Sequence, residues 1–211
     1  MDYELERLWR IKQNQIKMLN ARGFYTIHED WILDDNLTSK EFKRKLGNNN
    51  NNKSIRKLLY SKYEKQDSKN IVVYYVGLEN SKQIKVDSIR ECTEAMTNHN
   101  MDGILIINST LSTEALKHTN YITEQQLQIF TEDELLINIT EHVFQPLYFP
   151  MTMNESNDYK KEHGKNKLPG LLLKDPVAKY FNLKVGQIII THTDCYDDML
   201  TVRIEHVIVI N

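Results

Sequence analysis

Apolar residues in the first segment of the chain fall on one face of a helix. That face is formed by Leu5, Leu8, Trp9, Ile16 and Leu19. Their spacing follows the 3.6-residue period of an α-helix, and Gly23 stands where a helix commonly ends in a left-handed residue. The pattern predicts an amphipathic opening helix over residues 4–22.

A second, short helix is predicted to begin at a capping box. Thr38 and Glu41 have the spacing at which each side chain can bond the other residue's backbone N–H, and Leu37 and Phe42 can close a hydrophobic staple. The asparagine run at 48–52 has no apolar face to bury. It is therefore predicted to be an exposed loop.

Apolar runs then alternate with segments of helical periodicity. The predicted strands cover 71–76, 104–107 and 135–139, and the predicted helices cover 88–98 and 111–118. Ser88 and Glu91 have the spacing of a capping box for the first of these helices. Because strands that alternate with helices are typical of α/β domains, residues 1–147 are predicted to form one.

The remaining residues, 148–211, are predicted to form a small α+β domain. Residues 152–167 are polar and predicted to be a surface connector. A helix is predicted at 177–181, followed by strands at 187–193 and 200–210 with a polar turn at 194–198 between them. The pattern indicates a helix before a small antiparallel sheet.

Composition narrows the class of protein. The 211 residues are 27% charged and 40% hydrophobic, a balance typical of a folded chain. The formal net charge is −2, so attraction for nucleic acid must come from a local patch. Cys92 and Cys195 are too few for a disulfide framework. With no secretory signal and no apolar run of membrane-spanning length, an intracellular protein without a membrane partner is expected.

Two sets of residues offer candidate metal or thiol chemistry. The first set is His192, Asp194, Cys195, Glu205 and His206. Residues on opposite strand faces and in a turn do not converge on one ion, so exposed polar side chains are the favoured interpretation. In the second set, Cys92 with His99 or His118, the cysteine lies on the apolar helical face and is expected to pack as a small hydrophobe. We expect no metal and no cofactor.

A nuclease is the enzymatic alternative. An α/β domain can place carboxylates and a lysine around a metal ion. However, the predicted strands at 71–76 and 104–107 contain no acidic residue, and no phosphate-binding glycine loop or hydrolase motif is present in the sequence. A metal-dependent nucleic-acid-processing enzyme therefore stays as an alternative, not the first hypothesis.

Residues 40–69 carry ten basic and three acidic side chains, a local net charge of +7. The candidate patch consists of Lys43, Arg44, Lys45, Lys53, Arg56 and Lys57. Such a patch can contact a phosphate backbone, and it can equally be a solvated helix face and loop. A free DNA-binding module is therefore a further alternative.

The most specific motif lies in the second predicted domain. Leu168-Pro169 precedes Lys-Asp-Pro-Val-Ala-Lys-Tyr-Phe-Asn-Leu-Lys-Val-Gly-Gln at 174–187. Asp175 can cap a helix, and Pro176 suits its first position. The segment resembles the C-terminal signature of the fifth-largest subunit shared by eukaryotic nuclear DNA-directed RNA polymerases, and of the shorter archaeal form of that subunit. Residues 7–10, 22–25 and 135–146 resemble the first domain of the eukaryotic subunit.

The resemblance implies a non-catalytic polymerase subunit. Its first domain would be a jaw of nuclease-like but inactive shape beside downstream duplex DNA. Its second domain would dock on the largest subunit, next to other polymerase subunits. The implied assembly residues are Asp175, Pro176, Val177, Lys179, Tyr180, Gly186 and Arg203. The location would be the nucleus for a cellular protein, and a virion or a cytoplasmic transcription site for a viral one.

The chain also departs from the family pattern. Gly170 stands where the family usually has arginine, and Val185 where it has a basic residue before the turn glycine. A family Thr-Pro-Ser-Ala stretch is replaced at 112–115, and the C-terminus extends past Arg203 to Asn211. These departures favour a fast-evolving or large-DNA-virus version of the subunit.

Overall fold

The computed structural model describes residues 2–26, 37–46, 52–66, 70–78, 83–120, 126–164, 168–194 and 202–211. The chain forms two compact units, Met1–Ile137 and Asn138–Asn211. This division lies upstream of the predicted boundary at 147/148. The reason is that the 3-10 helix η2 (Ile139–Glu141) packs on the core of the second unit, where Ile139 contacts the buried cluster.

The first unit is built on a five-stranded mixed sheet with the order β1-β2-β3-β4-β5. The strands are β1 (Tyr25–Thr26), β2 (Ser61–Glu64), β3 (Ile71–Val76), β4 (Asp102–Ile107) and β5 (Leu127–Thr131). The pairs β1–β2 and β2–β3 are antiparallel, and β3–β4 and β4–β5 are parallel. The predicted strands at 71–76 and 104–107 are confirmed, and β1, β2 and β5 were not predicted.

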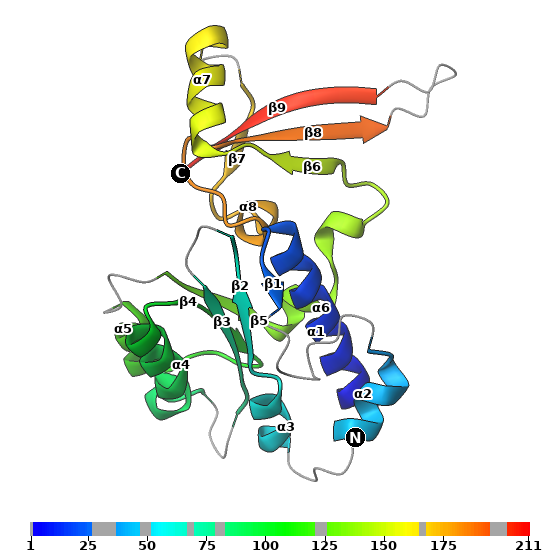
Figure 1. The fold of residues 1–211 in the computed structure, drawn as a ribbon, viewed down its shortest axis with the longest axis vertical. Helices are drawn as coiled ribbons and strands as arrows, with labels where there is room; N and C mark the ends of the chain where they lie inside the picture. The colour runs from blue at the N-terminus through cyan, green and yellow to red at the C-terminus, as the bar shows by residue number, and fades with distance from the viewer. Residues whose placement is uncertain are drawn as a thin grey trace. The chain divides into compact units, whose positions relative to one another are not determined.

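Helices cover both faces of this sheet (Figure 1). They are α1 (Asp2–Ala21), α2 (Ser39–Leu46), α3 (Asn52–Leu58), α4 (Val86–His99), α5 (Thr113–Asn120) and α6 (Glu132–Leu136). On one face, α4 and α5 bury Ile89, Met96 and Ala115 against Val72 and Leu105. The result is an α/β unit with an apolar core on that face, and buried apolar residues of α1, such as Leu8 and Leu19, pack on the other face.

The other face of the sheet, under α1, holds a buried polar network. Lys12 is 1% exposed, and its ammonium donates to Gln15 Oε1 at 3.0 Å and to Ser61 Oγ at 2.9 Å. Gln15 in turn donates to the Tyr63 hydroxyl at 2.9 Å, and Tyr75 donates to Gln15 Oε1 at 3.3 Å. These bonds satisfy polar groups that would be costly to bury unpaired.

The predictions for α1 and α2 are confirmed. Leu5, Leu8, Ile16 and Leu19 of the stripe are buried. Trp9 is half-buried, and its Nε1 donates to the Leu37 carbonyl at 2.9 Å. Gly23 follows with φ +81°. At α2 the Thr38 N–H donates to the Glu41 carboxylate at 3.1 Å, and the Glu41 N–H donates to Thr38 Oγ1 at 3.4 Å.

Two local predictions are wrong, and a third is tested at one residue only. Residues 135–136 end helix α6 and do not form a strand, because Thr131 and Glu134 close a capping box that starts a helix. Helix α4 begins at Val86, so Ser88 already lies in its first turn and caps nothing. Of the predicted asparagine loop, 48–51 lies outside the described residues, and Asn52 begins α3.

The second unit is a four-stranded sheet with the order β6-β8-β9-β7. Its elements are β6 (Leu147–Pro150), α7 (Met153–His163), β7 (Gly170–Leu172), α8 (Pro176–Tyr180), β8 (Ile188–Asp194) and β9 (Val202–Ile210). The predicted helix and both strands are confirmed. The sheet is mixed, because β7 runs parallel to β9, so the prediction of an antiparallel sheet is wrong.

Part of the predicted surface connector at 152–167 is the helix α7. Its start is a capping box, in which the Thr152 N–H donates to Glu155 at 2.7 Å and the Glu155 N–H donates to Thr152 Oγ1 at 3.3 Å. The polar composition misled the prediction because α7 buries only Ser156, whose hydroxyl accepts the Ile188 N–H at 2.9 Å. Among the described segments, no helix combines the length and apolar character that a membrane crossing requires.

Candidate functional site

Helix α2 carries the exposed part of the predicted basic patch. Phe42 and Leu46 are buried on one side of the helix, and Lys40, Arg44 and Lys45 are exposed on the other. Since the apolar side fixes the helix on α1, the exposed cations have a defined position. Lys40, which was not among the predicted patch residues, belongs to this surface, which we name the α2 basic surface.

Lys43 has a different place from its neighbours. Its ammonium lies 3.0 Å from Glu6 of α1, and Ser39 donates a short hydrogen bond to the same carboxylate. The Ser39 hydroxyl first, and then Lys43, lower the pKa of Glu6 to about 2. Lys43 thus helps fix α2 on α1.

The predicted patch residues of α3 also differ in exposure. Lys57 is exposed and forms an exposed ion pair with Glu91 at 2.8 Å. Lys53 lies in α3, but its side chain falls outside the described part of the structure.

Arg56 is not part of the exposed patch, and this prediction is corrected. Its residue is 4% exposed, and its guanidinium donates to Glu132 at 2.7 Å and to Glu4 at 2.6 Å. Burial lowers the pKa of Arg56, but its bonds to Glu132 and Glu4 outweigh burial and raise the pKa above its ordinary value. Arg7 also reaches Glu132, at 2.5 Å, and Asp133, at 2.8 Å.

This buried ion cluster lies at the carboxyl ends of the parallel strands. Gly77 directly follows β3, Asn108 follows β4, and Glu132 follows β5. A methyl group added to Gly77 would come within 2.7 Å of Arg56 Cδ, so the arginine fills the space beside that strand end. In α/β proteins this edge commonly holds ligand sites, but here Arg56 and Arg7 occupy both Glu132 oxygens.

The prediction that these strands contain no acidic residue is wrong for β4. Strand β4 begins at Asp102, so the strand does contain an acidic residue. However, its carboxylate accepts the Gln126 N–H at 2.9 Å, at the amino end of the strand. It therefore lies at the opposite end of the parallel strands from Glu132.

In the second unit, most residues of the C-terminal motif build the fold. The Asp175 carboxylate accepts the Val177 N–H at 2.8 Å and caps α8, with Pro176 at the first position. Val177 and Tyr180 are each 7% exposed. Gly186 adopts φ +84°, and its N–H donates to the Val209 carbonyl at 2.9 Å.

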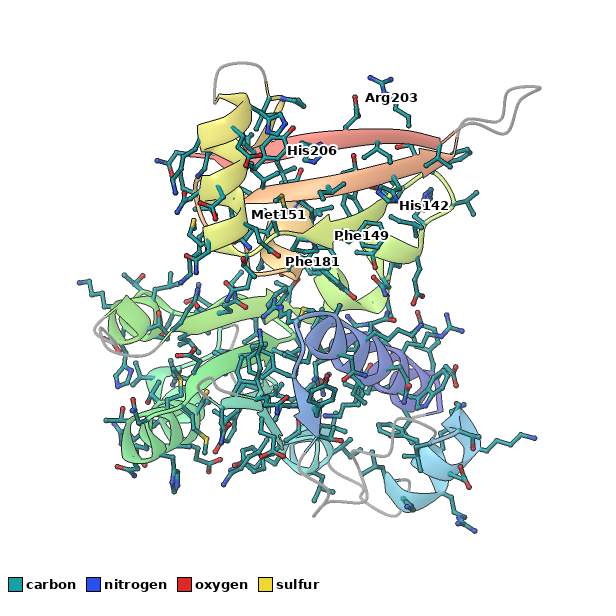
Figure 2. All side chains as sticks on the ribbon, turned by 45° about the horizontal axis from the view of Figure 1, so that its top comes forward. His142, Phe149, Met151, Phe181, Arg203 and His206 are labelled. Carbon is teal, nitrogen blue, oxygen red and sulfur yellow. The ribbon has the colours of Figure 1, made fainter. Side chains whose placement is uncertain are left out.

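The remaining predicted assembly residues are more accessible. Pro176 is exposed and Lys179 is half-buried. Arg203 extends from β9 and forms an exposed ion pair with Glu205 at 2.5 Å (Figure 2). The predicted assembly role of all these residues stays a prediction.

The candidate metal set does not converge in the part of the chain that is described. His192 packs on Phe149 with ring centroids 4.6 Å apart, and His206 stacks on Tyr159 at 4.5 Å. Cys195 and the side chain of Asp194 lie outside the described residues. No group of three or more potential metal ligands occurs among the described residues.

The candidate thiol is buried. Cys92 is 1% exposed, and burial raises the pKa of its thiol to about 12. Since the thiolate is the reactive form, Cys92 is a packing residue of α4.

Sequence reasoning missed the apolar surface of the second unit. Val143 is 79% exposed and Phe144 is 87% exposed, in the turn before β6. Leu147 and Phe149, on β6, are 61% and 46% exposed. The available signal was the presence of large apolar residues in a segment without helical periodicity.

Comparison with known families agrees with this two-unit fold. Residues 2–96 match the family model described as RNA polymerase Rpb5, N-terminal domain. Residues 137–197 match RNA polymerase Rpb5, C-terminal domain. The chain is thus a non-catalytic subunit of a multisubunit DNA-directed RNA polymerase. It belongs to the Rpb5 family, and the resemblance identified from the sequence is confirmed.

Individual relatives cover most of the chain. The DNA-directed RNA polymerases I, II, and III subunit RPABC1 of Caenorhabditis briggsae is 29% identical over 196 residues, which is 89% of this chain and 90% of the relative. The protein of the same description from Caenorhabditis elegans is 28% identical over equal shares. The DNA-directed RNA polymerases IV and V subunit 5B of Arabidopsis thaliana is 26% identical, over 90% of this chain and 85% of the relative.

Proposed function

We propose that the second unit docks this subunit on the largest subunit of its polymerase, and that the first unit presents the α2 basic surface to downstream duplex DNA. The observation that carries the DNA part is the arrangement of α2. Its exposed side displays Lys40, Arg44 and Lys45, and its buried side is fixed on α1 by Phe42, Leu46 and the Lys43–Glu6 pair.

The chemistry of this surface suits the DNA backbone and not the base edges. Lysine and arginine neutralise phosphates and release counterions, and these contacts carry no sequence information. The helix spans only eight residues and is held by its own apolar face. It is therefore proposed to lie along the backbone and not to enter the major groove.

The same proposal assigns the first unit a nuclease-like frame that has no nuclease chemistry. Metal-dependent nucleases need carboxylates with free oxygens at their site. Glu132, at the carboxyl edge of the sheet, instead has one oxygen bonded to Arg7 and the other to Arg56. This arrangement supports a structural use of the edge where an enzyme would bind its metal.

The DNA part can be tested by replacing Lys40, Arg44 and Lys45 with Gln in the assembled polymerase. Each lost phosphate contact should lower the slope of log affinity against log salt by about 0.9 for duplex DNA. The loss of template retention should therefore be largest at low salt and equal on unrelated sequences. The control is Lys117→Gln, on the exposed face of α5, which should leave retention unchanged.

Three results would count against this proposal. Equal retention of variant and parent at every salt would make the surface a solvated helix face. A loss confined to one template sequence would indicate base reading, which phosphate contacts do not provide. Tight DNA binding by the isolated chain at physiological salt would instead favour the free DNA-binding module.

A further inference from the structure

The residues expected to dock the second unit are largely used inside it. Asp175 caps α8, Val177 and Tyr180 belong to the buried face, and Gly186 bonds β9 through its N–H. A partner cannot contact side chains that are already enclosed. Only Pro176, Lys179 and Arg203 of the predicted set stay accessible, so the exposed surface outside the motif is a further candidate for docking.

The strand register divides the sheet of the second unit into two faces. One face packs under α8, where Ile189 and Val209 join the buried cluster together with Tyr148 and Val207. Residues that pair across strands share a face, and neighbours along a strand alternate. Two cross-strand rows therefore lie on the opposite face, Leu147–His192–Ile204 and Phe149–Ile190–His206.

That opposite face is only partly covered. At one end α7 lies over it, with Ile188 fully buried and Tyr159 stacked on His206. Beyond α7 the face is apolar and open, and we name this part the outer apolar face. It consists of Leu147, Phe149, Ile190, His192, Val202 and Ile204. Figure 2 labels Phe149 on β6, away from α7, and His206 beside α7.

The exposure of the outer apolar face is large for side chains of this type. Leu147 is 61% exposed, Phe149 46%, Val202 52% and Ile204 56%. Together these four leave on the order of 400 Å² of apolar surface, which is within the range of the largest apolar patch on a soluble monomer, a patch that is often functional. Val143 and Phe144, in the turn before β6, add to the exposed apolar surface of this unit.

The edge of the sheet next to this face cannot accept another strand. The Met151 N–H donates to the Ile188 carbonyl. In an antiparallel pair every second residue bonds the neighbouring strand, so the backbone groups of Phe149 and Leu147 bond β8. The backbone groups of the residues between them point away from β8, toward the free edge of the sheet. Those alternate positions are Tyr148, Pro150 and, just before the strand, Pro146. Because proline has no N–H, the outer edge offers a single backbone donor and is blocked against strand addition.

The chemistry of the face selects its occupant. His192 is the only ionisable side chain among the six, so a phosphate backbone would find no permanent cation there. A second copy bound face to face would bury roughly 800 Å² in total, below the ~1,200 Å² of stable specific interfaces. Another polymerase subunit needs less buried area at this face, because further contacts within the assembly also hold the two subunits together.

We propose that the outer apolar face receives an apolar segment of another polymerase subunit, with Phe149 and Ile204 as its anchors. This inference rests on the proposed docking of the second unit and specifies the surface that docks. Contact is through side chains on the face of the sheet, since the prolines block the edge. The partner segment carries aliphatic or aromatic side chains that cover Phe149 and Ile204.

The test uses the tagged full-length chain, expressed with its polymerase and purified by the tag. Phe149→Ser and Ile204→Ser should each reduce recovery of identified large polymerase subunits by roughly tenfold, as expected for buried interface anchors. Val185→Ser is the matched control, because Val185 is 46% exposed, as Phe149 is, but lies in the turn before Gly186. The control should recover the parent amount.

A second measurement, photo-cross-linking, detects the contact directly and does not require removal of an apolar side chain. A photo-cross-linking residue at position 204 should join an apolar segment of a polymerase subunit, mapped by mass spectrometry. The same residue at position 185 should not join that segment. Thermal unfolding of each variant checks that the exposed substitutions leave the fold intact.

The outcomes separate this inference from the function on which it rests. If the parent recovers no polymerase subunit, the proposed docking itself fails. If the parent and both variants recover equal amounts and position 204 cross-links to no subunit, the docking function stands and the outer apolar face is not its surface. Cross-linking of position 204 to a second copy of this chain would overturn the choice of occupant.

Discussion

The two units of this subunit differ in which unusual side chains they contain. The first unit has charged side chains in its interior, and the second has large apolar side chains on its surface. The first unit buries an ion cluster, in which Glu132 is 1% exposed and is bonded by Arg56 and Arg7. The second unit leaves large apolar side chains such as Phe144 and Ile204 in solvent. Buried charges that are paired within one unit need no partner protein. Exposed apolar surface, in contrast, is removed from water only when a partner protein covers it. The ion cluster of the first unit is therefore self-contained, and the exposed apolar surface of the second unit is suited to assembly.

The largest expected effect concerns where the second unit begins. A fragment of residues 138–211 keeps Ile139 and Tyr148, which pack on its core, and keeps β6 on the edge of β8. A fragment of residues 151–211 loses all three. We expect cooperative thermal unfolding of the longer fragment and none of the shorter one, because so small a core is marginal even when complete. A cooperative transition in both fragments would show that β6 and η2 are dispensable.

The next effect tests the buried ion cluster. Glu132→Ala leaves Arg56 and Arg7 without their shared carboxylate, and we expect the free energy of unfolding to fall by about 3–5 kcal/mol. Asp133→Ala is the control, because its carboxylate is 87% exposed and bonds the same Arg7, so its loss should cost about 1 kcal/mol or less. Urea unfolding of the full chain measures both. Equal small losses would mean that water reaches the cluster.

A smaller effect is expected at the cap of α8. Asp175→Ala removes the acceptor of the Val177 N–H and should cost about 1 kcal/mol of stability. Lys174→Ala, at the exposed neighbouring residue, should cost less than about 0.5 kcal/mol. In the polymerase co-purification assay, Asp175→Ala should reduce recovery less than Ile204→Ser. A larger loss of recovery for Asp175→Ala than for Ile204→Ser would indicate that the motif, and not the outer apolar face, docks the subunit.

The smallest effect is a pH dependence at Glu6. Its pKa is about 2 in the folded chain against an ordinary value of 4.5, so its contribution to stability is present above pH 4.5 and is lost as the pH falls toward 2. Glu6→Gln should therefore lower stability at pH 7, and the difference from the parent should shrink between pH 4.5 and 2. Glu41 and Glu155, whose pKa values are also lowered, are present in both proteins and cancel. A difference that does not change with pH would show that the Ser39 and Lys43 contacts are not electrostatic.

Sequence reasoning succeeded where the signal is local. The stripe of α1, the capping box of α2 and the Asp-Pro start of α8 each depend on residues within a few positions, and all three helices form as predicted. The capping box of α6 was equally local, but the apolar residues 135–139 gave a competing strand pattern. Similarly, the polar composition of α7 hid its capping box at Thr152.

The site was less predictable because burial depends on distant residues. Arg56 has the sequence context of a surface cation, yet Glu132 lies 76 residues further along the chain and encloses it. Conversely, the motif around Asp175 identified the family correctly, although most of its side chains build the fold. The exposed face of β6 and β9 follows only from the strand register, which the sequence pattern did not provide.

The most direct test of the central claim is purification of the tagged full-length chain with quantification of the polymerase subunits that accompany it. We predict recovery of the largest subunit and other identified polymerase subunits in fixed stoichiometry with the tagged chain. We also predict no cleavage of DNA by the chain alone. Recovery of the tagged chain without any polymerase subunit, together with metal-dependent cleavage or tight binding of DNA by the isolated chain, would contradict the claim.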